Sequence, residues 1–84
     1  MNGNVNVGDT AALIISGNTD RKKMKMKNDG SNTVFLGSDT SVTISTGFPL
    51  LTNEELLNND YTGDWYGICD TSEDTDVMFF EEVI

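Results

Sequence analysis

Polar and apolar residues alternate in several short stretches of this 84-residue chain, and turn-forming residues separate these stretches. The clearest is residues 22–28, where Met24 and Met26 alternate with lysines, a period of two that is typical of a half-buried strand. Other runs of strand length lie at residues 11–16, 33–36, 41–45, 64–69 and 76–84. Roughly six or seven short strands predict an all-β domain, either a small antiparallel β-sandwich or a jelly-roll-like barrel.

The segments between these runs carry specific turn and loop signals. Residues 28–32 contain an Asp-Gly pair between two alternating runs, which predicts a β-hairpin. Residues 47–50 are predicted to form a loop with an apolar tip, because Pro49 lacks the donor that an interior strand requires. Thr52 followed by Glu55 is a capping-box pattern and predicts one short helical turn in residues 52–57.

The length allows one domain. Residues 1–8 are rich in Asn and Gly and are predicted to be a flexible N-terminal arm, or a segment ordered by a neighbour, with residues 9–84 as a single β-sandwich domain. Domains this small often need a disulfide, a metal or partner subunits for stability. Partner subunits are the expected source here. The aromatic residues expected in the core are Phe35, Phe48, Trp65 and Phe79.

The charge is strongly polarised along the chain. Fourteen acidic and five basic side chains give a net charge of -9, and every basic residue falls within residues 21–27. An acidic chain of this kind disfavours nucleic acid and anionic membranes as partners. The lysines could contact an acidic partner surface. Alternatively, they could protect an edge strand or pair with the acidic C-terminal strand of the same chain, which we favour because the rest of the chain is acidic.

The residue types limit the possible chemistry. Without histidine, the common Ser-His-Asp and Cys-His arrangements cannot form, and Cys69, the single cysteine, is interpreted as a small buried hydrophobe. The segment 70–76 is interpreted as an exposed acidic turn, without the dry pocket that acid–base catalysis needs. We therefore expect no enzyme activity, no catalytic residue, no cofactor and no favoured metal site. A weak calcium candidate remains in its carboxylates, Asp70, Glu73, Asp74 and Asp76.

Three motifs follow one another along the chain. An alternating strand runs from Arg21 to Asn28 and leads into Gly-Ser-Asn-Thr-Val-Phe-Leu-Gly at residues 30–37. Thr-Gly-Phe-Pro-Leu follows at residues 46–50, and Gly-Asp-Trp-Tyr-Gly-Ile at residues 63–68. In this order the motifs resemble a family of very small bacteriophage virion proteins, and the resemblance covers residues 21–84.

The resemblance implies a capsid decoration or cement protein, a compact β-sandwich or jelly-roll-like module that stabilises the phage head. It would be made in the host cytoplasm and incorporated into the virion, where it would bind the major capsid protein as a homo-oligomer, with a trimer favoured. One alternative is a head-tail connector, neck or tail accessory protein. Another is a calcium- or carbohydrate-binding adhesion module.

Two groups of residues are predicted to make the contacts of such a protein. The charged strand contributes Arg21, Lys23, Lys25 and Lys27, whose side chains would meet an acidic surface. The apolar loop contributes Phe48, Pro49 and Leu50, which could insert into a neighbour or close the core of their own domain.

Overall fold

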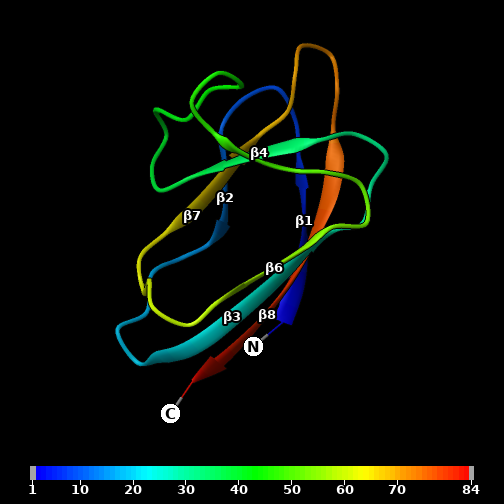
Figure 1. Cartoon of the computed structure of the whole chain (residues 1–84). Coiled ribbons are helices and arrows are strands. Elements are labelled where there is room, and N and C mark those ends of the chain that lie inside the picture. The colour runs from blue at the N-terminus through cyan, green and yellow to red at the C-terminus, as the bar shows by residue number, and fades with distance from the viewer. Residues whose placement is uncertain (1, 84) are drawn as a thin grey trace.

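The computed structural model describes residues 2–83 and consists of two antiparallel sheets packed face to face (Figure 1). The first has the order β1-β8-β3-β6, with β1 at Asn2–Val7, β8 at Thr75–Val83, β3 at Arg21–Asn28 and β6 at Glu55–Asn58. The second has the order β2-β7-β4-β5, with β2 at Ala12–Ile15, β7 at Trp65–Ile68, β4 at Val34–Gly37 and β5 at Phe48–Leu50. We call the first the charged sheet and the second the uncharged sheet, because the four strands of the second contain no charged residue.

The chain passes from one sheet to the other after nearly every strand. Only β4 and β5 are consecutive strands that pair within one sheet. This order of four strands in each sheet is that of the eight-stranded jelly roll. The prediction of an all-β antiparallel sandwich or jelly roll is therefore confirmed, with eight strands in the described chain instead of six or seven.

The core lies between the sheets and is mostly aliphatic. Met24 and Met26 are almost completely buried, whereas Lys23 and Lys25 on the same strand are exposed, so the predicted alternation is confirmed. The expectation of an aromatic core is only partly met, because Phe48 is 61% exposed and Trp65 and Phe79 are only partly buried. The fully enclosed positions belong to smaller side chains, including Val7, Val34 and Val77.

The N-terminal segment is a strand, so the prediction of a flexible arm is wrong for residues 2–7. They pair antiparallel with β8, from Asn2 opposite Phe80 to Val7 opposite Thr75. The reason is the alternation of Asn with Val, which buries Val7 completely and partly buries Val5 against the core. Met1 lies outside the described residues.

The predicted hairpin at residues 28–32 is also wrong, because this segment joins β3 of the charged sheet to β4 of the uncharged sheet. Its conformation is set by the amide of Asn28, which is fully buried. The Asn28 Nδ2 donates to the carbonyl oxygens of Asn32 and Leu50 at 2.7 and 2.8 Å, and its Oδ1 accepts from Gly30 N and Thr75 Oγ1 at 3.1 and 2.7 Å. The side chain thereby links both sheets with its hydrogen-bonding groups satisfied.

Two further local predictions fail, the first because of hydrogen bonds within the segment and the second because of pairing with a distant strand. Residues 41–45 form turns instead of a strand, with the hydroxyl groups of Thr43 and Thr46 bonding to each other and to nearby backbone N–H groups. The predicted helical turn at residues 52–57 is replaced by β6, which pairs with β3. Pro49 belongs to β5, which is compatible with proline because β5 is at the edge of its sheet.

Candidate functional site

The outer surface of the charged sheet is the candidate site, and we call it the open face. It comprises the outward-pointing side chains of all four strands: Asn2, Asn4, Asn6, Lys23, Lys25, Lys27, Glu55, Leu57, Asp76, Met78, Phe80 and Glu82. The registers place Lys25 between Phe80 and Leu57. They place Lys27 between Met78 and Glu55. Lys25 therefore lies between two apolar side chains, and Lys27 lies between an apolar and an acidic one.

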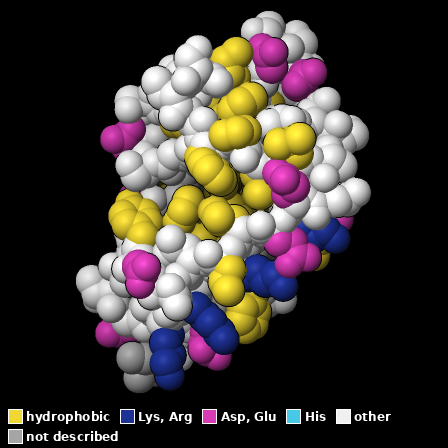
Figure 2. All heavy atoms as spheres, viewed as in Figure 1, with side chains coloured by type: hydrophobic (Ala, Val, Ile, Leu, Met, Phe, Trp, Pro, Cys, Tyr) yellow, Lys and Arg dark blue, Asp and Glu magenta, His cyan; other side chains and the backbone are white. Residues whose placement is uncertain are grey.

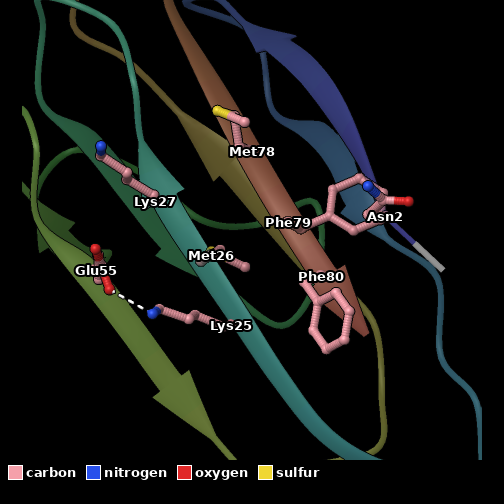
Figure 3. A pocket seen from close by; sticks show the side chains of 8 residues that line it. All are labelled: Asn2, Lys25, Met26, Lys27, Glu55, Met78, Phe79 and Phe80. Carbon is pink, nitrogen blue, oxygen red and sulfur yellow. Dashed lines mark ion pairs between the residues drawn. The ribbon is translucent and has the colours of Figure 1, made fainter. Parts of the chain in front are cut away.

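Large apolar side chains on the open face reach solvent. Leu57 is 65% exposed, Phe80 50% and Met78 44%. Two shallow hollows of about 290 and 530 Å³ lie on this face, and Lys25, Glu55 and Phe80 line both. Figure 3 shows the first hollow, with Phe80 and Met78 projecting from β8 beside the lysines of β3. Exposed apolar groups rimmed by charges are typical of protein-binding surfaces.

The lysines of the open face are partly neutralised within the chain. Lys25 Nζ lies 2.8 Å from Glu55 Oε1, and Lys23 Nζ lies 3.9 Å from Glu82 Oε1. The hydrogen bond from Lys25, followed by its positive charge, lowers the pKa of Glu55 below its ordinary value. The interpretation that the lysine strand pairs with the acidic C-terminal strand is confirmed. The edge-strand interpretation is wrong, because β3 lies between β8 and β6.

Arg21 does not belong to the open face, so its prediction as a contact residue is wrong. Its side chain is 1% exposed, and its Nε lies 2.6 Å from Glu81 Oε2. The remaining nitrogens donate to the carbonyl oxygens of Ser16, Tyr61 and Gly63 at 2.7, 3.3 and 3.0 Å. Arg21 therefore ties β3 to β8 and to two connecting segments, and it has a structural role.

The three residues of the predicted apolar loop differ in burial. Leu50 is 2% exposed and packs in the core opposite Val34, so its prediction as a contact residue is wrong and the core-closure alternative holds for it. Phe48 and Pro49 are exposed on β5. They lie at the edge of the uncharged sheet and do not join the open face.

The outer face of the uncharged sheet is partly covered by the loop of residues 38–47. Val42 in this loop is buried, and a Cβ added to Gly37 would overlap its side chain. A Cβ added to Gly47 would likewise overlap Phe35 on β4. In Figure 2, basic side chains gather in the lower half of the molecule, over the charged sheet, with hydrophobic side chains beside them and across the middle and upper part.

The calcium candidates do not form a metal site in residues 2–83. No group of three or more Asp, Glu, Cys or His side chains in this part of the chain is placed to hold a metal ion. Asp70 instead accepts a hydrogen bond from Thr71 N at 2.7 Å, and Asp76 accepts from Asn6 Nδ2 at 2.9 Å. The described residues also contain no helix that is both long and apolar enough to cross a membrane.

Cys69 is buried where the two sheets meet. Its Sγ donates to Val7 O at 3.3 Å, and its backbone N–H donates to Gly8 O at 2.8 Å. Burial, with smaller contributions from Glu73, Asp74 and Asp9, raises the pKa of the thiol to about 11. The interpretation of Cys69 as a buried hydrophobe is confirmed.

The sequence interpretation missed the apolar members of the open face. Met78 and Phe80 stand at the outward positions of β8, between Asp76 and Glu82, where alternation predicts polar residues. That departure was readable in the sequence as a sign of a binding surface. Comparison with known proteins gives no further guide, because no protein-family model, curated protein or solved structure matches the chain.

Proposed function

We propose that the protein is a non-enzymatic bacteriophage structural protein that decorates or cements the capsid surface, docking on the major capsid protein through the open face. The observation that carries the proposal is the exposure of Phe80, Met78 and Leu57 among lysines on an uncovered sheet surface. Such a surface offers both contact area and charge. It fits a protein whose task is to bind another protein.

Fold and sequence pattern supply the capsid part of the proposal. Jelly rolls recur in viral capsid proteins, although lectins and cupins share the architecture, so the fold supports the proposal by analogy. The motifs beginning at Arg21 resemble those of small phage virion proteins. Arg21 and Asn28, at the two ends of β3, are buried structural residues. The resemblance at these two positions therefore concerns residues that stabilise the fold.

The geometry indicates the chemistry of the surface that would receive the open face. Phe80 is an aromatic side chain near the centre of the hydrogen-bonded sheet, with Lys25 beside it. Aromatic anchors surrounded by polar groups often dominate the free energy of binding at protein interfaces. We expect an apolar recess that takes Phe80 and carboxylates that meet the lysines.

The main test is co-sedimentation with purified cognate capsid shells. Phe80→Ser should weaken binding at least about tenfold, because truncation of a central aromatic residue commonly costs more than about 1.4 kcal/mol. Phe48→Ser is the matched control, since Phe48 is at least as exposed as Phe80 but lies on β5 of the other sheet. Equal binding by the wild type and the Phe80 variant would overturn the role of the open face.

The charged contribution is tested by reversing Lys23 and Lys25 together. Lys23→Glu/Lys25→Glu should weaken binding and make it less sensitive to salt. Lys22→Glu is the control on the same strand, because Lys22 is exposed but does not line either hollow of the open face. Unchanged binding and salt dependence would assign the lysines to the fold alone.

Copy number separates decoration from the accessory roles. A decoration protein should be present in purified virions at a number comparable with the capsid lattice, as measured by quantitative mass spectrometry. About a dozen copies per particle would favour the head-tail connector, neck or tail alternative, in keeping with the small number of symmetry-related positions there. Absence from virions would contradict both.

A further inference from the structure

Among residues 2–83, the two sheets have four edge strands, and three of them carry features that hinder pairing with another strand. Strand β5 has only three residues and contains Pro49. Strand β2 has four residues, with a register shift between Leu13 and Ile15. Strand β6 also has four residues and carries the charged Glu55. Short length, proline, bulges and charge are the common devices that protect sheet edges.

The fourth edge, β1, lacks all of these features. It spans six residues, Asn-Gly-Asn-Val-Asn-Val, with no charge and no proline. Its pairing with β8 is regular from Asn2 to Val7. A long, regular and uncharged edge is a template for adding a strand.

The direction of the unpaired backbone groups follows from the neighbouring strands. Asp29 N donates to Asp76 O at 2.8 Å, so the even-numbered residues of β8 point toward β3 and the odd-numbered ones toward β1. The residues opposite them, Gly3, Val5 and Val7, therefore bond to β8. The backbone N–H and C=O groups of Asn2, Asn4 and Asn6 point to the open edge. Gly8 is also an even-numbered residue, and its carbonyl oxygen points away from β8 in the same way, accepting a hydrogen bond from Cys69 N.

We infer that a second copy of the chain pairs with this edge, antiparallel, about a two-fold axis at Asn4. In this register Asn4 faces Asn4 of the other copy, and Asn2 faces Asn6, so each outward-pointing backbone group finds a partner. The sequence of β1 complements itself, because its neutral amide side chains meet one another on the outer surface and no like charges are opposed. A second copy is thus the occupant that this edge fits.

The dimer would extend the charged sheet to eight strands. An antiparallel two-fold of this kind keeps the outer surfaces of both copies on the same side, so the two open faces would lie next to each other. This inference does not depend on the capsid role. It also differs from the trimer that the resemblance implied, because an isologous strand pair closes at two copies.

Light scattering over a range of concentrations tests the inference on the full chain. A reversible dimer with twice the 9.2 kDa mass is expected. Asn4→Pro removes one outward N–H from each copy without removing a bond to β8, and should raise the dimer dissociation constant at least about tenfold. Asn4→Thr keeps the N–H and should remain dimeric. A circular dichroism spectrum of Asn4→Pro that matches the wild type shows that the fold is intact.

Hydrogen exchange identifies the edge that is used. The amide protons of Asn4 and Asn6 should exchange slowly in the dimer and become faster on dilution. A wild type that is monomeric throughout, a trimer, or a dimer unaffected by Asn4→Pro would overturn the inference. Protection of Asn4 that arises only when capsid shells are added would assign the edge to a different protein, and would overturn it as well.

Discussion

The two sheets of this sandwich are built from the same type of strand but expose very different outer surfaces. The charged sheet contains every basic residue of the protein, all on β3, with carboxylates on β6 and β8. The four strands of the uncharged sheet contain neither basic nor acidic residues. Its loop of residues 38–47 folds back over β4, where Val42 packs on Gly37. One surface is therefore partly covered by the chain itself, over β4, although Leu13 and Phe48 stay exposed at its edges, whereas the other has no such loop over it.

The difference shows how a small chain divides its surfaces between folding and binding. A sheet covered by its own loop needs few charges for solubility, because less of its apolar area reaches water. An uncovered sheet needs charges, and Lys25 and Glu55 provide them beside Phe80. Apolar groups left exposed among these charges are then available to a partner.

The largest effect is expected at Arg21, the one basic residue that is inside the charged sheet. Arg21→Met should lower the free energy of unfolding by about 3–5 kcal/mol, because it leaves Glu81 buried without its guanidinium partner. Urea denaturation measures the change. Arg21→Met/Glu81→Met should recover most of the loss, since both charges are then removed. A loss below about 1 kcal/mol in the single variant would contradict a structural role for the pair.

Cys69 tests how firmly the two sheets stay together. Since burial raises the pKa of its thiol from 9.0 to about 11, the thiolate fraction at pH 8 should be lower on the order of 100-fold than in the unfolded chain. Reaction with a thiol reagent should slow by at least this factor in the native protein. The raised pKa also means that stability falls as the pH rises from about 9 toward about 11. Equal rates with and without denaturant would show that the junction opens freely.

Val42 tests whether the loop of residues 38–47 is what shields the uncharged sheet. Val42→Ser should lower the free energy of unfolding by about 2 kcal/mol, because a buried side chain is replaced by a polar one. Binding of a hydrophobic dye should increase as the sheet is uncovered. Ile44→Ser is the control in the same loop, where the side chain is 43% exposed, and it should cost less than about 0.5 kcal/mol. A similar cost for both would contradict a shielding role.

The smallest effect concerns the exposed pair on the open face. The pKa of Glu55, measured by NMR titration, should lie below its ordinary value, and Lys25→Met should raise it. Lys23→Met should leave it nearly unchanged, because Lys23 is paired with Glu82. Since the folded-state pKa is lowered, the stabilising contribution of this pair is present above the ordinary pKa and is lost as the pH falls through the lowered one. A Glu55 pKa that does not respond to Lys25→Met would contradict the contact.

Much of the fold could be predicted because alternation is a local signal. Met24 and Met26 were correctly placed inside, and Lys23 and Lys25 outside, from sequence alone. The class of fold followed from the repetition of such runs. The assignment of strands to sheets did not follow. An Asp-Gly pair favours a turn equally in a hairpin within one sheet and in a connection between two sheets. At residues 28–32 the choice depends on Asn28 reaching Leu50 and Thr75, which are distant in sequence.

The candidate site was predicted only in part, since the charge of a residue does not show whether its side chain is buried or exposed. Arg21 and the lysines share one run, yet only Arg21 turns inward, toward Glu81. A hint was present in β8, where alternation places Glu81 on the same face as the buried Val77 and so requires a buried partner. Phe80 was missed for a different reason. It was assigned neither to the expected core nor to the contact residues, although its position in the alternation of β8 indicated an exposed side chain.

The pairing of β1 with β8 has a consequence for how the protein is made. These strands are the first and last of the described chain, and they lie side by side (Figure 1). The charged sheet also places β8 between β1 and β3, so neither has its central neighbour until residues 75–83 have been synthesised. Folding then waits for a contact between distant parts of the chain, which slows it and exposes the uncharged edge of β1 meanwhile. The growing chain on the ribosome should therefore remain largely unfolded until β8 emerges.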